Sequence, residues 1–259
     1  MRIAVIGCGS IGTRHLQTLI ALGQDVIPFD CAKPEMNSAA QWQHVINADA
    51  ALICTPAASH AFDARTLLEE GWDKPLFVEK PLALKVEDCA VFAGWPHPTV
   101  QVGYQLRFHS DVWWLKDAVR APTLAHVLVR WDARRYTHGL LESSHELDLL
   151  RFFMGDLRVR EAYRQPDGEL WVYFGNGIEA RIHYGSATYY RSWHLQNGRR
   201  DAGVAFSTPE QLGAQMYRDE LQHFLVCASQ RLVPNCTVAD GIAAIDLCDQ
   251  VNELARQTA

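Results

Sequence analysis

The chain has 259 residues, of which 48% are hydrophobic and 21% are charged, and its formal net charge at pH 7 is -6. This composition is typical of globular proteins and excludes disordered, collagen-like and coiled-coil chains. A net acidic chain without a run of lysine and arginine is not expected to bind nucleic acid or a membrane surface. No apolar stretch approaches the roughly 20 residues of a membrane span, and no signal peptide is recognisable, so a cytoplasmic protein is expected.

The first hundred residues alternate short apolar strands with helices. This alternation predicts crossover connections and a doubly wound parallel sheet of the Rossmann type over residues 1–105. Pro28 lies in the second strand and places that strand at a sheet edge or makes it end there. The predicted strands are residues 2–7, 25–30, 48–54, 75–79 and 99–102, with helices at 11–22, 59–70 and 86–93.

Residues 106–259 have a different pattern, in which several strands follow one another between helices. Asp167-Gly168 and Asn176-Gly177 are hairpin-turn signals between these strands. The pattern predicts an α+β domain with an open, largely antiparallel sheet, and the junction at residues 103–108 contains no flexible linker. The predicted helices are residues 109–120, 140–154, 214–228 and 238–256, and the predicted strands are 124–132, 158–163, 169–174, 178–184 and 189–196.

A glycine motif stands between the first predicted strand and the first predicted helix. It has the form G-x-G-x-x-G, which permits a tight turn, close approach of a pyrophosphate and close packing of helix on strand. Asp30 follows at the end of the second strand, where an acidic side chain meets the adenosine ribose of NAD. Asp30 also repels a ribose 2′-phosphate, so NAD is predicted rather than NADP, although Lys33 could soften the repulsion. The motif residues are Gly7, Gly9, Ser10, Ile11 and Gly12.

Five segments of the sequence form a set of motifs in a fixed order. They are GCGSIG at 7–12, CTPAASH at 54–60, EKP at 79–81, VGYQLRF at 102–108 and ESSHELDLL at 142–150. With these motifs the chain resembles the Gfo/Idh/MocA oxidoreductases, the group of glucose–fructose oxidoreductase and inositol dehydrogenase, from its first residues to about residue 150. The resemblance implies a nucleotide-binding domain followed by an open-sheet domain, and hydride transfer on a sugar or cyclitol hydroxyl.

Hydride transfer to or from an alcohol carbon needs an acid or base near the reacting oxygen. Lys80 follows a buried strand, where partial desolvation and a nearby nicotinamide would lower its pKa, and it is predicted to contact that oxygen. His145 lies on a predicted helix three residues after Glu142 and three before Asp148, so the three side chains share one face. An imidazole between carboxylates can relay a proton, although a helix-capping role for this segment remains an alternative.

The remaining site candidates follow from the motifs and the resemblance. Arg107 could clamp a carboxylate or phosphate on the substrate. Tyr217 resembles a position near the substrate in sugar-acting relatives, and an ordinary helix residue is an equal alternative. The predicted cofactor contacts are Gly7, Gly9, Ser10, Ile11, Gly12, Asp30, Thr55, Pro56, His60, Glu79 and Lys80. The predicted substrate contacts are Tyr104, Arg107, Asp148 and Tyr217, with Lys80, His145 and Glu142 as the catalytic set.

A metal site is a rival interpretation of part of the sequence. Glu142 with His145, and Glu220 with His223, form E-x-x-H segments with the spacing of di-iron bundles. Such sites need four antiparallel helices and two further glutamates, which a chain that opens with βαβ does not supply. The seven cysteines contain no C-x-x-C pair and are expected to be buried thiols, so no metal is predicted.

The favoured function is therefore an NAD(P)-dependent oxidoreductase acting on a hydroxyl or keto carbon of a sugar, nucleotide sugar or cyclitol. Two alternatives stay open: a dinucleotide-binding ligand sensor without net chemistry, and a redox-neutral glycosidase that retains NAD. The WVYF run at residues 171–174 is apolar on both faces, so one face is expected to meet a partner subunit. A homo-dimer or homo-tetramer through the C-terminal sheet is predicted.

Overall fold

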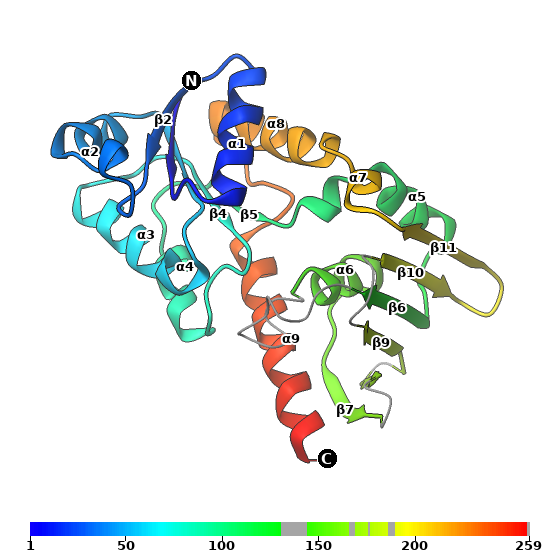
Figure 1. Cartoon of the computed structure of the whole chain (residues 1–259). Coiled ribbons are helices and arrows are strands. Elements are labelled where there is room, and N and C mark those ends of the chain that lie inside the picture. Colours follow the sequence, from blue (N-terminus) through cyan, green and yellow to red (C-terminus); the bar gives the residue numbers. More distant parts are fainter. Residues whose placement is uncertain (131–143, 166–168, 176, 186–189, 258–259) are drawn as a thin grey trace. The chain divides into compact units, whose positions relative to one another are not determined.

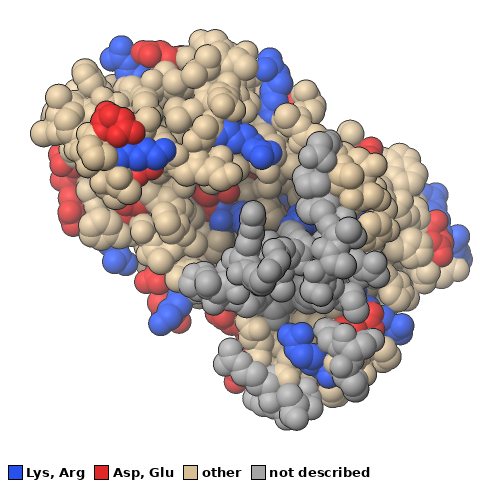
Figure 2. Space-filling model, viewed as in Figure 1, with Lys and Arg blue, Asp and Glu red and all other residues tan. Residues whose placement is uncertain are grey.

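The computed structural model describes residues 1–130, 144–165, 169–175, 177–185 and 190–257 (Figure 1). The chain forms two compact units. The first contains Met1–Gln105 and Tyr217–Ile245, and the second contains Leu106–Met216 and Asp246–Ala259. The division into functional domains at residue 105 stays a prediction. Acidic and basic side chains are interspersed over the face shown in Figure 2.

The first unit is built on a five-stranded parallel sheet with the order β2-β1-β3-β4-β5. The chain leaves β1 to form β2 on one side and then returns to form β3 on the other, so the strand order reverses at β1. Ligands of doubly wound sheets bind at the carboxyl ends of the strands at such a switch point. The strands are β1 (Arg2–Ile6), β2 (Asp25–Phe29), β3 (Ala50–Ile53), β4 (Leu76–Glu79) and β5 (Val100–Gly103).

Helices cover both faces of this sheet, which explains why every residue of β3, β4 and β5 is buried. In Figure 1, α1 and α8 lie on one side of the strands and α2 and α3 on the other. Leu221 and Phe224 of α8 join Leu19 of α1 and Phe77 of β4 in one apolar core. Helix α8, which follows the second sheet in the chain, thereby completes the core of the first unit. The helices are α1 (Ser10–Ala21), α2 (Ala39–Ile46), α3 (His60–Glu69), α4 (Ala90–Ala93) and α8 (Gln215–Gln230), and α9 (Val238–Gln257) continues from the first unit into the second.

The second unit is built on a six-stranded sheet with the order β11-β10-β6-β9-β8-β7. The β6–β9 pair is parallel and the other four pairs are antiparallel. Alternate residues of β8 are buried, whereas Trp171 and Tyr173 on the other face are half-buried. The strands are β6 (Leu124–Arg130), β7 (Val159–Arg164), β8 (Leu170–Phe174), β9 (Glu179–Gly185), β10 (Tyr190–Gln196) and β11 (Asp201–Phe206).

Helices α5 (Ser110–Ala118) and α6 (Ser144–Met154), together with the short α7 (Pro209–Leu212), complete the second unit. Glu146 of α6 pairs at 3.5 Å with Arg191 of β10, both buried, which places α6 over the inner face of the sheet. The structure confirms the predicted fold class, a parallel Rossmann sheet followed by an α+β unit with a largely antiparallel sheet. It adds α2 and β11, which the sequence analysis did not predict.

Candidate functional site

The glycine-rich turn joins β1 to α1, and each of its glycines has a separate steric reason. Gly7 has φ +91°, and a Cβ there would lie 2.6 Å from the Thr55 nitrogen. A Cβ on Gly12 would lie 1.9 Å from the Gly7 oxygen, so helix and strand could not pack as they do. A Cβ on Gly9 would have no described atom within 4 Å. Gly7 and Gly12 are therefore required for the fold, whereas Gly9 leaves open space in which a ligand can approach the backbone.

Asp30 lies beside this turn, as the motif predicts. Its Oδ2 accepts a hydrogen bond from the Cys8 amide at 2.9 Å, and its Oδ1 accepts one from the Ala32 amide at 3.0 Å. The Lys33 ammonium donates to the Cys8 carbonyl at 2.6 Å. The carboxylate and the ammonium thus bind the two backbone groups of the same residue, Cys8, near the place where a bound nucleotide would present its ribose hydroxyls.

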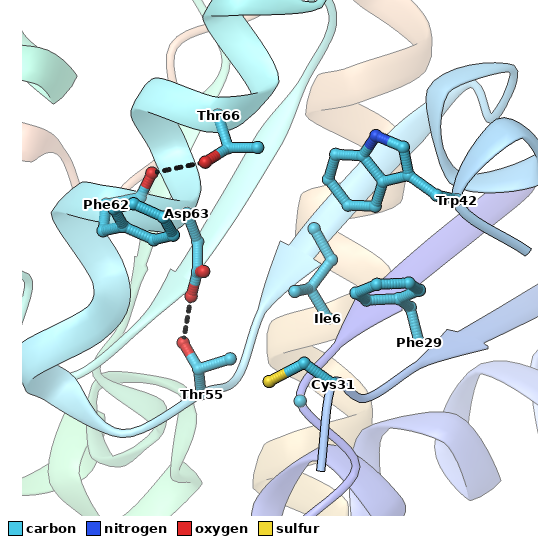
Figure 3. A pocket seen from close by; sticks show the side chains of 9 residues that line it. Ile6, Phe29, Cys31, Trp42, Thr55, Phe62, Asp63 and Thr66 are labelled. Carbon is cyan, nitrogen blue, oxygen red and sulfur yellow. Dashed lines mark hydrogen bonds between the residues drawn. The ribbon is translucent and has the colours of Figure 1, made fainter. Parts of the chain in front are cut away.

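A pocket of about 270 Å³ opens next to the turn (Figure 3). This volume is close to the lower end of the range for small-molecule sites, about 300 Å³. Figure 3 shows aromatic rings on both sides of the pocket, so its walls suit a flat aromatic group. The residues that line it are Ile6, Gly7, Phe29, Cys31, Trp42, Thr55, Phe62, Asp63 and Thr66.

Polar groups hold one wall of this pocket together. The Thr55 hydroxyl donates to Asp63 at 2.5 Å, and burial raises the pKa of the Asp63 carboxyl. The Nε2 atom of His60 lies 2.9 Å from the backbone carbonyl oxygen of Thr55, and its Nδ1 atom lies 2.9 Å from the backbone carbonyl oxygen of Pro81. Burial lowers the pKa of His60, and the ring lies between a carbonyl group of the CTPAASH segment and one of the EKP turn. The contacts of His60 and of Pro56 with the cofactor stay predictions.

The EKP turn follows β4 at the carboxyl edge of the same sheet. Glu79 is 6% exposed, and its Oε2 accepts a hydrogen bond from the Lys80 amide at 3.1 Å. Its Oε1 accepts from Nε2 of His15 at 2.6 Å, and His15 is fully buried. Lys80 is half-buried, and the Lys80–Pro81 peptide bond is cis. The predicted reactive lysine therefore stands at the same sheet edge as the glycine turn.

Two of the predicted substrate residues belong to the first unit. Tyr104 is fully buried directly after β5. The Tyr217 hydroxyl accepts a hydrogen bond from Gln105 at 3.2 Å, and the Arg14 guanidinium lies 4.7 Å from the centre of its ring. Burial raises the pKa of Tyr217, which is therefore a neutral phenol at pH 7.

The other candidates belong to the second unit. His145 is 4% exposed and Asp148 is 1% exposed on α6, which is buried from Ser144 to Leu150. Arg107 donates two hydrogen bonds to Asp148, so the two predicted substrate residues pair with each other. Glu142 lies outside the described residues. The convergence of His145 with Lys80 stays a prediction.

Sequence reasoning missed three elements of this region. It did not find the aromatic pocket walls Phe29, Trp42 and Phe62, which come from separate elements without a shared motif. It did not find His15, although Gly12, His15 and Leu19 mark the buried face of α1 by their spacing. It considered Glu220 only as a metal ligand, whereas the structure buries it completely in the first unit.

The described residues contain no group of three metal-ligating side chains. His223 of the second E-x-x-H segment accepts a hydrogen bond from the Asn235 amide at 3.0 Å, and burial lowers its pKa. Within the same part of the chain, none of the helices has the length and hydropathy to span a membrane.

Comparison with known proteins begins at the glycine turn. Residues 1–93 match the model of a family described as an oxidoreductase family with an NAD-binding Rossmann fold, the Gfo/Idh/MocA family. The matched range contains the glycine turn, Asp30, the aromatic pocket and the EKP turn.

Inositol dehydrogenases are among the similar sequences. Inositol 2-dehydrogenase of Ralstonia nicotianae is 28% identical over 187 residues, which are 60% of this chain and 55% of that protein. Inositol 2-dehydrogenase of Acidothermus cellulolyticus is 30% identical over 191 residues, 62% of this chain and 55% of that protein. The chain thus matches little more than half the length of these curated relatives.

Solved structures show the same fold over nearly the whole chain. Scyllo-inositol dehydrogenase from Lactobacillus casei, solved with NAD(H) and scyllo-inositol, has a TM-score of 0.81 at 16% identity. That match covers 99% of this chain and 97% of the other. UDP-N-acetylglucosamine 3-dehydrogenase from Acidithiobacillus ferrooxidans has a TM-score of 0.74 at 19% identity and covers 100% and 98% of the two chains.

The glycine turn, the acidic side chain at the end of β2 and the parallel sheet define a dinucleotide-binding Rossmann protein. The match of residues 1–93 to the Gfo/Idh/MocA oxidoreductase family, together with the similar inositol 2-dehydrogenases, confirms the resemblance seen in the sequence. The predicted NAD cofactor agrees with the description of that family.

Proposed function

We propose that the protein is an NAD(H)-dependent oxidoreductase that acts on a hydroxyl-bearing or keto carbon of a cyclitol, sugar or nucleotide sugar. The names of its relatives support this substrate class, since they include inositol 2-dehydrogenases and a UDP-N-acetylglucosamine 3-dehydrogenase. The observation that carries the proposal is the contact of the Asp30 carboxylate with the Cys8 amide inside the glycine turn.

The residues of the first unit fit a dinucleotide. The open space at Gly9 admits a pyrophosphate to the N-terminus of α1, whose backbone N–H groups attract anions. Asp30 offers two acceptor oxygens to ribose hydroxyls, and it repels a 2′-phosphate, which favours NAD over NADP. The aromatic pocket would hold the adenine ring, since Phe29, Trp42 and Phe62 line it. When bound, the nicotinamide of NAD supplies a hydride acceptor or donor.

The chain itself supplies the proton chemistry and the orientation of the substrate. Lys80 contacts the reacting oxygen and moves its proton, and His145 with Glu142 relays protons to and from that oxygen. Tyr104 and Tyr217 line the substrate region from the first unit. Arg107 and Asp148 contribute from the second unit, where their mutual pairing fixes both side chains.

The experiment is a turnover screen with purified protein, NAD and NADP, and a panel of inositols, sugars and nucleotide sugars. Absorbance of the reduced nicotinamide should change with at least one substrate and with NAD in preference to NADP. Product formed without a net absorbance change indicates the redox-neutral glycosidase instead. Binding of NAD and of a sugar without product indicates the ligand sensor. A tenfold or greater preference for NADP(H) in affinity contradicts the assignment of NAD.

The open face of the second sheet supports an oligomer. Trp171 and Tyr173 stand half-buried on that face beside Arg181, whose guanidinium lies 4.5 Å from the centre of the Trp171 ring. A second copy of this chain would cover these rings, which gives a homo-dimer or homo-tetramer. Light scattering at micromolar concentration tests this proposal, and a monomer contradicts it.

A further inference from the structure

Glu79 connects the EKP turn to the helix of the glycine turn through its two oxygens. Oε2 accepts from the Lys80 backbone amide at 3.1 Å, and Oε1 accepts from His15 of α1 at 2.6 Å. A Cβ on Gly103 would lie 3.1 Å from the Glu79 Cδ, so the glycine at the end of β5 leaves the space that the carboxylate fills. The carboxylate therefore has one position, with a partner for each oxygen.

The ring of His15 also has a defined position. It is fully buried, and its ring packs edge-on against Phe77 at 5.4 Å and Tyr217 at 6.1 Å between centroids. A second buried acid, Glu220 of α8, lies close enough to Glu79 for the two charges to interact. Burial, and then the charge of Glu79, raise the pKa of Glu220 well above its ordinary value. Burial of a second carboxyl group so near Glu79 leaves His15 and the Lys80 amide as the hydrogen-bond donors to the Glu79 carboxylate.

A buried pair of this kind is not needed for stability alone. Moving a carboxylate out of water costs several kcal/mol, and apolar side chains of equal volume are often as stable. The Glu79 carboxylate binds the backbone of the residue next to it, however, which an apolar side chain could not do. From this geometry we infer that Glu79, held by His15, is a positioning residue that fixes the backbone of Lys80 relative to helix α1. The inference rests on the proposed function for the role of Lys80, but the contact itself can be measured without turnover.

The test uses the five lysines of the chain, which give five backbone amide signals after labelling with ¹⁵N-lysine. Lysine-to-arginine variants assign the Lys80 signal. Glu79→Gln keeps the size of the side chain but leaves one carbonyl oxygen to serve both the Lys80 amide and His15. Amide hydrogen exchange at Lys80 should accelerate about 10- to 100-fold, the range that a charge-assisted hydrogen bond is worth. The other four lysine amides should change less than threefold.

Glu220→Gln is the matched comparison, since it changes another buried glutamate of the same unit to its amide. The two carboxyl oxygens of Glu220 have no hydrogen-bond partner among the described residues, so exchange at Lys80 should stay within threefold of the original protein. Equal acceleration in both variants would mean that loosening of the whole unit exposes Lys80, and that result overturns the inference. Unchanged exchange in Glu79→Gln also overturns it.

Activity gives the second readout. In Glu79→Gln, kcat should fall at least tenfold and by a larger factor than the Kd for NAD rises, because the glycine turn keeps its contacts with Asp30 and Lys33. The exposed Glu69→Gln variant serves as the control for both values. A lower melting temperature with unchanged kcat would assign Glu79 a structural role only and overturn the inference. If the original protein turns over no substrate, the proposed function fails, and the exchange rates still decide whether Glu79 fixes the Lys80 backbone.

Discussion

The Arg107 guanidinium and the Asp148 carboxylate form a bidentate pair, with Nε 2.8 Å from Oδ2 and Nη2 2.5 Å from Oδ1. The two side chains are 8% and 1% exposed. The pair links the segment after Gln105 to helix α6, which carries His145. Both residues were predicted as separate substrate contacts, and the structure adds a connection that holds α6 in place.

Breaking this pair should destabilise the protein strongly. Arg107→Ala removes both hydrogen bonds and the positive charge that Arg107 offers to the buried Asp148 carboxylate, and breaking a buried pair in this way typically costs about 3–5 kcal/mol. Urea denaturation followed by tryptophan fluorescence measures the loss as a lower midpoint. Arg120→Ala is the control, because Arg120 pairs with Asp117 while both side chains are 76% exposed, and such pairs contribute about 0–1 kcal/mol. Equal midpoints for the two variants would contradict the prediction.

Substitutions at two glycines of the turn should have different effects, one on NAD binding and the other on the stability of the fold. Gly9→Val adds a side chain in open space, so the protein should fold with an unchanged melting temperature while NAD affinity falls at least tenfold. Gly12→Ala forces a Cβ against the Gly7 carbonyl and should lower the melting temperature itself. Calorimetric titration with NAD and thermal unfolding test the pair. A Gly9→Val protein with normal NAD affinity would remove the turn from the binding site.

Asp30 should determine the choice of cofactor. Asp30→Ser removes the two carboxylate oxygens and the repulsion of a 2′-phosphate, while Lys33 remains to attract it. The Kd for NAD should rise about tenfold, since a hydrogen bond to a charged group is worth about 1.5–3 kcal/mol, and the preference for NAD over NADP should narrow. The exposed Asp73→Ser variant provides the control. Unaltered Kd values for both cofactors would show that Asp30 serves the turn alone.

Lys80 should matter for chemistry and not for cofactor binding. Lys80→Met keeps an unbranched chain of similar length without the amine, so turnover should fall about 10²- to 10⁴-fold while the Kd for NAD is retained. Lys85→Met, at an exposed position five residues on, is the control for the loss of one positive charge. Steady-state kinetics and NAD titration give the two values. A loss below tenfold removes Lys80 from the catalytic role.

His145 should act in proton transfer. His145→Ala should reduce turnover by about 10²-fold or more, the usual contribution of a general acid or base. The profile of kcat against pH from 5 to 9 should also lose one ionisation. The exposed His44→Ala variant should leave rate and profile unchanged. An identical profile in His145→Ala would assign this histidine to the packing of α6.

The sequence predicted those parts of the fold that depend on local patterns. The strands of the first sheet, the glycine turn and the placement of Asp30 follow from neighbouring residues, and Pro28 correctly marked β2 as an edge strand. Strand β11 was missed, although Asn197-Gly198 before it is a hairpin signal and Gly198 has φ +77°. Its sequence, DAGVAF, contains a glycine and two alanines, which are depleted in strands, and the strand pairs on one side only.

Long-range contacts could not be derived in the same way. The sequence of the helix at residues 215–230 does not indicate which sheet the helix covers, because the spacing of its apolar residues would allow it to pack on either sheet. The pairing of His15 with Glu79 spans 64 positions, and that of Arg107 with Asp148 spans 41. Sequence analysis assigns each residue a role from the residues next to it in the chain. The partner of each of these side chains lies in a distant segment, so neither pair could be predicted.

The return of helix α8 to the first sheet has a consequence for biosynthesis. Leu221 and Phe224 cover apolar surface of strands made more than one hundred residues earlier, including Phe77. While the ribosome translates the intervening segment, that surface waits without its final cover, a condition that favours aggregation of nascent chains. The first unit can therefore complete its core only after the strands of the second unit have been synthesised.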